Sequence, residues 1–514
     1  MNLSTLQLLD SYLRGTRGLV LIFLAVLACV IAGLRKAQAP FLRYLLAPLL
    51  AALALPVGAL GAWLIGIVLP EPLSEMASLG VYLALGFAIG RWWPAAVAGV
   101  QHHRGALVGD PTASFASGQL KPCPGHSLTL AGLAVPPADE TKHFKMIGTT
   151  GTGKSTAIRE LLSGALARGD RAVIADPDGG YLARFFDPER GDLILNPFEP
   201  RSRRWDLFGE IRQPYDVDQL ARALIPDGCG EDRIWQQYAQ VFLAALMRQA
   251  SESGNGDIAE VYRLTTTAPV EELRLLLEGT PAQPFLAAGN ERNFGSTRSV
   301  TTAAVASLAF IAKQKAAPLS IRTWVNEGRG VLFLPYRVDQ IASLRCVIST
   351  WMRVAIFETM NRPEGDGRLW FVVDELDALG QIDGLKDALA RLRKFGGRCV
   401  LGFQSIAQVS GTYGNAQAHT IVENCGNTLI LRCSASEGGG TAQFASRLIG
   451  EREIIREQVS TSRRPQELLS SRTTSHQHVT ESAVLASEIE QLPDLQGFLK
   501  VASQPQWRRA ILSI

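Results

Sequence analysis

The residues from Gly148 to Ser155 follow the spacing G-x-x-x-x-G-K-S, a pattern that can bind a phosphate chain. An apolar run precedes them and a run of helix-forming residues, Ala157 to Ala167, follows, so we expect a strand, a loop and a helix. Glycine lets the backbone curl until its N–H groups point at a phosphate, and the helix N-terminus adds partial positive charge. The expected contact residues are Gly148, Thr149, Thr150, Gly151, Thr152, Gly153, Lys154, Ser155 and Thr156.

Two side chains of this loop have expected roles of their own. We expect the Lys154 ammonium group to contact the β- and γ-phosphates of ATP, and the Ser155 hydroxyl to ligate Mg2+. The alternative is a chance glycine-rich turn, which the length of the pattern and its flanking segments disfavour.

A second acidic segment could supply the rest of a hydrolytic site. The apolar run Leu369–Val373 is strand-like, and the carboxylates of Asp374 and Glu375 follow it directly. Asp374 would hold Mg2+ through water, while Glu375 would orient and polarise the attacking water. An ordinary helix cap is the alternative, but a phosphate-binding loop earlier in the chain favours the catalytic roles. We therefore predict an ATPase that uses Mg2+.

The next predicted strand, Cys399–Phe403, ends in Gln404. A polar side chain at the tip of a strand beside Asp374 can sense the γ-phosphate or hydrogen-bond the attacking water. The alternative is a glutamine that only caps the following helix. We include Gln404 among the expected catalytic residues.

A basic run lies before that strand, at the end of a predicted helix over Leu385–Phe395. If the helix continues, Arg391, Lys394 and Arg398 share a face at spacings i, i+3 and i+7, and Arg393 lies between them. Such a face can offer an arginine finger to a neighbouring subunit's γ-phosphate, or contact a DNA backbone. A solvated positive face is the alternative.

The segment Asp176–Gly179, which reads Asp-Pro-Asp-Gly, ends another predicted strand. Ligands bind at the carboxyl ends of strands in a doubly wound sheet, but the same four residues also form a plain turn. The sequence leaves both interpretations open.

From about residue 105 onward, strand-like runs alternate with helical patterns, which predicts an α/β fold with a parallel sheet. The predicted strands are Ala172–Ala175, Val331–Leu334, Leu369–Val373, Cys399–Phe403, Thr428–Leu431 and Phe498–Ala502. Between 206 and 325 the pattern is helical, which indicates an all-α domain inserted between residues 106–205 and 326–514. The predicted helices there are Asp216–Leu224, Glu231–Gln249, Pro269–Leu277 and Thr297–Ala312. We expect a loop or a mobile segment over Ser460–Ser475, which is rich in Ser, Thr and Arg.

Residues 1–105 form a predicted membrane anchor. The run Tyr44–Pro70 carries no charge and exceeds the roughly 20 residues that a helix needs to span a bilayer. With a further run that ends near Trp93, it forms a predicted hairpin over about 44–93, and Gly18–Leu34 is an additional apolar segment. Basic residues flank the hairpin, whereas the only charged residues in the connection between its two helices are Glu71 and Glu75. We therefore expect both ends of the hairpin in the cytoplasm. The first apolar segment either spans the membrane or lies at its inner surface.

Bulk composition adds little. The net charge of +3 over 514 residues is too small to indicate nucleic acid or a membrane surface by itself. The seven cysteines show no metal-type spacing and indicate reduced thiols in a cytosolic compartment.

Several separate motifs together resemble those of the type IV coupling proteins of conjugation, the TrwB/TraD family. The resemblance rests on the N-terminal apolar region, the phosphate-binding loop and a set of short motifs spread over most of the chain. These motifs are Ala175-Asp-Pro-x-Gly179, Ile194-Leu-Asn-Pro-Phe198 with Trp205, Leu369-Trp-x-x-x-Asp-Glu-Leu376, Gly402-x-Gln-Ser405 with Gln408 and Tyr413-Gly414, and Glu488-Ile-x-x-Leu-Pro-Asp-Leu495.

The resemblance implies a RecA-like P-loop NTPase domain interrupted by the all-α domain, assembled as a homohexamer. It implies a multi-pass protein of the bacterial inner membrane with its nucleotide domain in the cytoplasm. It also implies ATP-driven transport of DNA, with phosphate contacts to single- and double-stranded DNA, between a relaxase in its relaxosome and the channel proteins of a type IV secretion system. By analogy, Arg393 is the arginine finger and Gln404 the γ-phosphate-linked glutamine.

The chain departs from the family pattern in offering three apolar runs where two spans are usual. Its modest charge also leaves open a coupling protein that recruits protein effectors and uses ATP for assembly or unfolding rather than for pumping DNA.

Overall fold

The computed structural model divides the chain into two compact units, His103–Glu453 with Thr480–Ile514, and Met1–His102 with Ile454–Val479. The described residues are 16–37, 39, 41–70, 73–92, 101–109, 128–227, 232–254, 256–365, 367–436, 439–462 and 471–513. Some predicted features lie outside these ranges. They are Glu71, Trp93, residues 110–127 of the predicted nucleotide domain and the middle of the loop expected over Ser460–Ser475.

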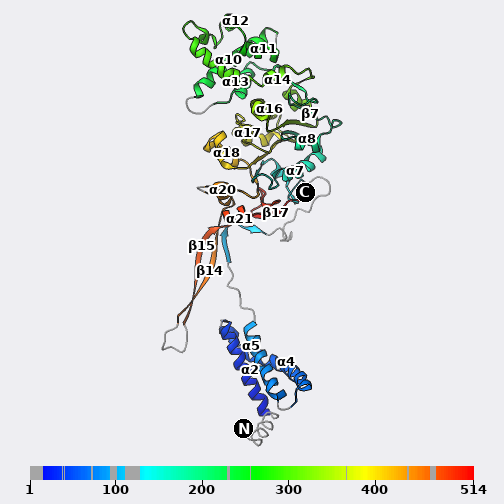
Figure 1. Ribbon diagram of the computed structural model, residues 1–514, viewed down its shortest axis with the longest axis vertical. Helices are drawn as coiled ribbons and strands as arrows, with labels where there is room; N and C mark the ends of the chain where they lie inside the picture. The colour runs from blue at the N-terminus through cyan, green and yellow to red at the C-terminus, as the bar shows by residue number, and fades with distance from the viewer. Residues whose placement is uncertain are drawn as a thin grey trace. The chain divides into compact units, whose positions relative to one another are not determined.

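A ten-stranded sheet forms the centre of the larger unit (Figure 1). Its strands lie in the order β2-β17-β16-β13-β5-β12-β11-β6-β10-β7. Neighbours from β13 to β7 run parallel, whereas β16 pairs antiparallel with both β13 and β17. The strands are β2 (Val108–Gly109), β5 (Phe144–Ile147), β6 (Arg171–Pro177), β7 (Leu193–Ile194), β10 (Val331–Tyr336), β11 (Leu369–Val373), β12 (Gly397–Phe403), β13 (Asn427–Ile430), β16 (Gln496–Lys500) and β17 (Trp507–Ile511).

Helices cover both faces of this sheet (Figure 1). The helices of this part are α6 (Pro137–Glu140), α7 (Lys154–Ala167), α8 (Gly180–Phe185), α15 (Ile321–Glu327), α16 (Ile341–Met360), α17 (Leu385–Leu392), the 3-10 helix η3 (Arg393–Phe395), α18 (Ile406–Tyr413), α19 (Asn415–Glu423), α20 (Gly440–Ile449) and α21 (Ala486–Glu490). A short hairpin, β3 (Thr129–Leu130) and β4 (Leu133–Ala134), precedes them.

The central strands β10 and β11 carry no charged residue because both of their faces are buried. Every residue of β10, β11 and β12 is buried. In β11, Phe371 and Val373 pack in the cluster that contains α16 and α17, whereas Trp370 and Val372 pack in the cluster that contains α7 and α8. Burial on both faces is typical of parallel strands between helical layers, and it explains why these segments read as uninterrupted apolar runs.

The predicted α/β architecture is confirmed. Each of the six predicted strands is present, as β6, β10, β11, β12, β13 and β16, with ends displaced by at most two residues. The parallel order of β5, β12, β11 and β6 places the carboxyl ends of these strands along one edge of the sheet.

A helical segment leaves and re-enters this unit through two strands that pair with each other. Strand β8 (Arg204–Trp205) runs parallel to β9 (Pro318–Leu319), with Trp205 opposite Leu319. Between them lie η1 (Phe208–Glu210), α9 (Asp216–Leu224), α10 (Asp232–Glu252), α11 (Ile258–Thr266), α12 (Val270–Leu276), η2 (Gln283–Leu286), α13 (Glu291–Val305) and α14 (Leu308–Ala312). The predicted helices are thus present, and the one expected over Thr297–Ala312 is divided between α13 and α14.

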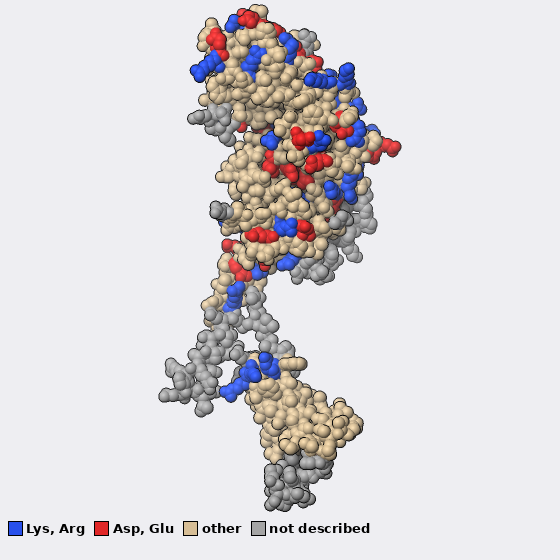
Figure 2. Space-filling view, in the orientation of Figure 1, with Lys and Arg blue, Asp and Glu red and all other residues tan. Residues whose placement is uncertain are grey.

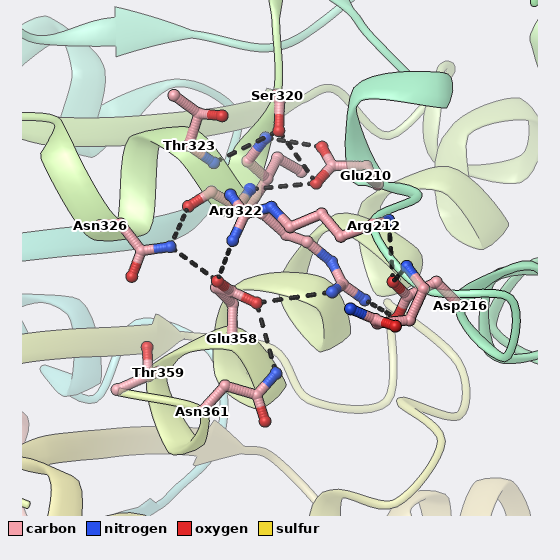
Figure 3. Close-up of polar contacts among 12 residues, drawn as sticks. Glu210, Arg212, Asp216, Ser320, Arg322, Thr323, Asn326, Glu358, Thr359 and Asn361 are labelled. Carbon is pink, nitrogen blue, oxygen red and sulfur yellow. Dashed lines mark hydrogen bonds and ion pairs between the residues drawn. The ribbon is translucent and has the colours of Figure 1, made fainter. Parts of the chain in front are cut away.

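Ion pairs fasten the start of the helical segment to α15 and α16 (Figure 3). In α16, Glu358 accepts hydrogen bonds from Arg212 Nη1 at 2.8 Å and from Asn326 Nδ2 at 2.6 Å. In α15, Arg322 Nη2 donates to Asp216 Oδ1 at 2.7 Å.

Buried Glu210 lies beside these ion pairs. Its carboxylate accepts hydrogen bonds from Trp205 Nε1 at 3.1 Å, from the Ile321 N–H at 2.6 Å and from the Arg322 N–H at 3.0 Å. Burial raises the pKa of Glu210 to about 7, although these donors oppose the rise. Together the contacts hold the entrance of the helical segment against its exit.

The smaller unit contains the predicted apolar region, as α2 (Thr16–Lys36), α3 (Phe41–Tyr44), α4 (Ala47–Val68) and α5 (Leu73–Trp92). Within the described residues, three helices are long and apolar enough to cross a membrane: Gly18–Lys36 of α2, α4 and α5. Glycines let α2 and α5 approach closely, because a Cβ atom at Gly90 would collide with the Val30 carbonyl oxygen and one at Gly33 with the Phe87 carbonyl oxygen.

The prediction of a loop over Ser460–Ser475 is wrong for the residues of this segment that the structure describes. Strands β14 (Glu451–Ser462) and β15 (Ser471–Ser482) occupy both of its ends, and they are neighbours in a three-stranded sheet with β1 (Gln101–Gly105). The Ser- and Thr-rich composition indicated a polar segment, which the prediction took for a loop. Threonine also has high strand propensity, and Thr461, Thr473 and Thr474 lie in these two strands.

A buried histidine fastens the start of β12 to α17. His143 Nδ1 accepts a hydrogen bond from the Cys399 N–H at 3.0 Å, and Nε2 lies 2.9 Å from the Leu389 carbonyl oxygen. Both contacts are satisfied by the neutral imidazole with its proton on Nε2. Burial, together with the charges of Arg398 and Arg393, lowers the pKa of His143 to about 4, although the contact with the Leu389 carbonyl oxygen opposes the change.

We predict that His143 makes the larger unit sensitive to acid. Because its folded-state pKa lies below its ordinary value of 6.5, its stabilisation is complete above about pH 6.5 and is lost as the pH falls towards 4. Acidification from about pH 7.5 to 5 should remove about 2 kcal/mol of the free energy of unfolding through this group. Thermal unfolding of wild type and His143→Gln at both pH values checks this. The stability gap between them should narrow in acid, and a constant gap contradicts the prediction.

Candidate nucleotide-binding and hydrolysis site

The phosphate-binding loop connects β5 to α7, as the sequence predicts. All of β5 is buried, and α7 begins at Lys154. Gly151 and Gly153 have φ angles of 79° and 115°, which side chains rarely tolerate. A Cβ atom at Gly148 would lie 2.8 Å from Thr152 Oγ1, so the first position of the motif also requires glycine.

Distant segments hold this loop in place. The Thr149 N–H donates to the Arg432 carbonyl oxygen at 2.9 Å, just beyond β13. The Leu495 N–H donates to the Thr152 carbonyl oxygen at 2.9 Å, and a Cβ atom at Gly153 would lie 2.9 Å from the Leu495 side chain. The late Leu-Pro-Asp-Leu motif therefore buttresses the loop, although more than 300 residues separate them in the sequence.

Lys154 is buried and curls back over the loop. Its Nζ donates to the carbonyl oxygens of Gly148 at 2.6 Å and Thr149 at 3.1 Å. Burial lowers the pKa of Lys154, and the nearby carboxylates of Asp374 and Glu375 oppose this change. The ammonium group is therefore close to the loop interior, where a phosphate chain would lie. Thr156 follows in the first turn of α7, half-buried.

Asp374 lies just beyond β11 and meets two hydroxyl groups. Its Oδ2 accepts hydrogen bonds from Ser155 Oγ at 2.6 Å and from Tyr181 Oη at 2.8 Å. Its Oδ1 is buried and has no hydrogen-bond partner among the described residues. A buried carboxylate oxygen without a donor, beside the Ser155 hydroxyl, fits Mg2+, which prefers hard oxygen ligands. Asp374 and Ser155 are thus the residues that would hold the metal.

Tyr181 was not foreseen, and the Asp-Pro-Asp-Gly segment positions it. The Asp176 carboxylate accepts the N–H groups of Tyr181 at 3.0 Å and Leu182 at 2.7 Å, so it fixes the first turn of α8. Burial raises the pKa of Asp176 to about 6, and the charge of Asp374 adds to the rise. Asp176 and Pro177 end β6, and Asp178 and Gly179 form the turn before α8. Ligand binding by this segment stays a prediction. A tyrosine placed just after such a turn was the only local signal for its contact with Asp374.

A hydrogen-bonded chain joins the loop to Glu375 through Gln404. Thr150 Oγ1 donates to Gln404 Oε1 at 3.0 Å, and Gln404 Nε2 donates to Glu375 Oε1 at 2.9 Å. Burial raises the pKa of Glu375, although the hydrogen bond from Gln404 opposes this. The geometry thus brings Gln404 and Glu375 beside the loop, where a carboxylate could accept a proton from water.

The basic residues before β12 do not join this cluster. Arg393 lies in η3 with an exposed side chain, at the amino end of β12, whereas Gln404 follows its carboxyl end. The seven residues of β12 span about 20 Å, so Arg393 is at the opposite edge of the sheet from the phosphate-binding loop.

The expectation that Arg398 shares a face with Arg391 and Lys394 is wrong. The helix ends at Leu392, and Arg398 lies within β12. Its side chain is buried, and its Nε donates to Glu140 Oε2 at 2.9 Å.

Comparison with known proteins shows which family the sequence matches. A family model described as "Type IV secretion-system coupling protein DNA-binding domain" matches residues 127–511. The coupling protein TraD of Escherichia coli strain K12 is 31% identical over 368 residues, which cover 70% of this chain and 51% of TraD. This chain therefore spans about half the length of that relative.

Solved structures of the plasmid coupling protein TrwB have the same fold. The complex of TrwB with a non-hydrolysable ATP analogue, ADPNP, is 30% identical, with a TM-score of 0.71 over 80% of this chain and 94% of that chain. The TrwB complex with ADP and Mg2+ is 32% identical, with a TM-score of 0.67 over 76% of this chain and 89% of that chain.

We predict that Tyr181→Phe weakens the Mg2+-dependent part of nucleotide binding. The change removes one of the two hydroxyl donors that orient Asp374 Oδ2 but keeps the buried ring. Loss of one hydrogen bond to a charged group corresponds to about a ten- to hundred-fold change at most. The dissociation constant of ADP, measured by calorimetry with Mg2+ and with chelator, should rise only with Mg2+. Tyr262→Phe, in the helical segment, is the control. Equal weakening in both buffers would contradict the prediction.

Proposed function

Because this chain belongs to the family of type IV secretion-system coupling proteins, we propose that it is a membrane-anchored ATPase that drives DNA from a relaxosome into a secretion channel. The observation that carries the ATPase assignment is the buried Asp374 carboxylate, which has Ser155 on one oxygen and no donor among the described residues on the other. The nucleotide-bound structures of TrwB support the same assignment.

In the proposed reaction, each side chain acts from the place it already occupies. Lys154 binds the β- and γ-phosphates in this proposal, and Ser155 and Asp374 would hold Mg2+, which would supply charge neutralisation. Glu375 orients the attacking water and accepts its proton, which its raised pKa favours. Gln404 fixes the Glu375 carboxylate and the Thr150 hydroxyl relative to each other.

We propose that residues 106–205 and 326–514 form a RecA-like domain, interrupted by an all-α domain over 206–325. Paired strands β8 and β9 at its boundaries support this division, as does a cluster of buried residues that all belong to the helical segment. This cluster contains Phe242, Leu246, Leu264, Leu273 and Phe294 among its buried residues. Other residues of the segment pack in the larger cluster with α16.

Subunits assemble as a homohexamer in this proposal. Arg393 lies at the edge of the sheet opposite the phosphate-binding loop of its own subunit. As an arginine finger it could therefore reach only the nucleotide of a neighbouring subunit. Contacts with single- and double-stranded DNA are made to phosphates, and the relaxase and secretion-channel proteins are the expected protein partners.

We further propose that the protein lies in the bacterial inner membrane with its nucleotide unit in the cytoplasm. Apolar helices α2, α4 and α5 supply the spans. The last turn of α2 carries Arg35 and Lys36, and the last turn of α5 carries Arg91. Basic residues of this kind favour the cytoplasmic side.

ATP hydrolysis by the full chain, with and without single-stranded DNA at low salt, tests this function. We expect DNA to stimulate turnover, and Lys154→Ala to lower it by about a hundredfold or more, because the phosphates lose a direct cationic partner. Lys386→Ala, outside the site, should keep wild-type turnover. Retained turnover in Lys154→Ala would exclude the assigned chemistry. Hydrolysis that ignores DNA but responds to a bound protein would favour effector recruitment.

Mixing two inactive variants tests whether Arg393 acts across a boundary. A Lys154→Ala subunit keeps its arginine, and an Arg393→Ala subunit keeps its phosphate-binding loop. In a random 1:1 mixture about a quarter of the interfaces should therefore be competent, and about a quarter of wild-type turnover should return. Arg391→Ala, an exposed neighbour, should be active alone. No recovery in assemblies shown to contain both variants would falsify the trans role.

A further inference from the structure

Two basic segments run side by side where the chain enters and leaves the helical segment. The Arg204 N–H donates to the Ala317 carbonyl oxygen at 3.0 Å, and Arg204 lies opposite Pro318 in the β8–β9 pair. The residues before each strand are therefore neighbours. Residues 198–204 and 310–318 together contain five basic residues and one acidic residue.

An aromatic pair closes the other end of these segments. Phe198 and Phe310 have ring centroids 4.9 Å apart with an interplanar angle of 59°, yet 40% and 37% of their surfaces remain exposed. Phe198 is held in its turn by its N–H, which donates to Asn196 Oδ1 at 2.7 Å. The Asn196 Nδ2 group in turn donates to the Pro335 carbonyl oxygen at 2.8 Å. A large apolar ring is thus fixed at the surface by a buried asparagine.

Basic residues follow both rings closely in the sequence, Arg201 and Arg203 after Phe198, and Lys313 and Lys315 after Phe310. Figure 2 shows Lys and Arg side chains gathered over β7 and α14, the elements that flank Phe198 and Phe310. Arg203, Lys313 and Lys315 are exposed, and within the described ranges none of them lies within ion-pair distance of a carboxylate. The one acidic residue, Glu199, is already paired with Arg201 at 2.6 Å. The positive charge is therefore uncompensated locally.

We propose that this surface, formed by Phe198, Phe310, Arg201, Arg203, Lys313 and Lys315, binds single-stranded DNA. The inference rests on the proposed function and adds a location for the DNA contact. Exposed rings stack on unpaired bases of any sequence, and nearby cations bind the phosphates between them. A duplex keeps its bases stacked inside, so it could use only the charges. Only the rings therefore select single strands, whereas the cations add affinity for either form of DNA.

These two effects can be separated in one binding experiment. A fluorescein-labelled oligothymidylate is titrated with the full-length protein in detergent, without nucleotide, at several salt concentrations. Arg203→Gln with Lys313→Gln should reduce the slope of log K against log salt by about 1.4, or about 0.7 per lost phosphate contact. Phe198→Leu with Phe310→Leu keeps the apolar volume and should weaken binding by about five- to hundred-fold with an unchanged slope.

Arg292→Gln, an exposed arginine elsewhere in the helical segment, is the matched control and should change neither quantity measurably. Hydrolysis without DNA should stay at the wild-type rate in every variant, because none of these residues contacts the nucleotide site. If the protein is not an ATPase, the wild-type protein will show no hydrolysis either. The oligothymidylate affinities are measured without nucleotide, so they do not depend on that outcome.

Two outcomes would overturn the proposal. In one, both double variants bind the oligothymidylate with wild-type affinity and slope. In the other, size-exclusion chromatography shows that the variants lose assembly, and DNA affinity follows the assembly state alone. The surface would then be a contact between copies of this chain.

Discussion

The position of one carboxylate, that of Asp374, governs the whole catalytic edge of the sheet. Its Oδ2 accepts hydrogen bonds from Ser155 on α7 and Tyr181 on α8, so a single oxygen fixes two helices relative to β11. The approach of β12 is equally constrained, because a Cβ atom at Gly402 would collide with the Asp374 carbonyl oxygen. Glu375 and Gln404 can meet only because these two strands are so close.

The sequence was sufficient to predict those parts of the site that depend on residues close together in the chain. A glycine-rich loop between a strand and a helix has few alternatives, and carboxylates at the end of a parallel strand must lie at the same edge as that loop. Lys154, Asp374, Glu375 and Gln404 are therefore brought together as expected. Their chemical roles stay predictions, and so does the finger role of Arg393.

Contacts that depend on partners far away in the sequence could not be foreseen. The predicted basic face required a helix that continues past Leu392. Instead α17 ends at Leu392, and the short helix η3 that follows it ends just before Gly396, which has a φ angle of 73°. Arg398 then enters β12 and meets Glu140, 258 positions earlier in the chain. Tyr181 was missed for the same reason, since nothing near it in the sequence identifies Asp374 as its partner.

The pairing of β8 with β9 has an evolutionary consequence. Because the helical segment begins and ends at adjacent strands, its two attachment points stay together whatever the chain does between them. Closing a longer loop at such a junction adds only a small entropic cost, about 0.6 kcal/mol for each doubling of length. Helices can therefore be gained, lost or exchanged between Trp205 and Leu319 without a change in the strand order of the sheet. Selection can remodel that region while the catalytic edge is inherited intact.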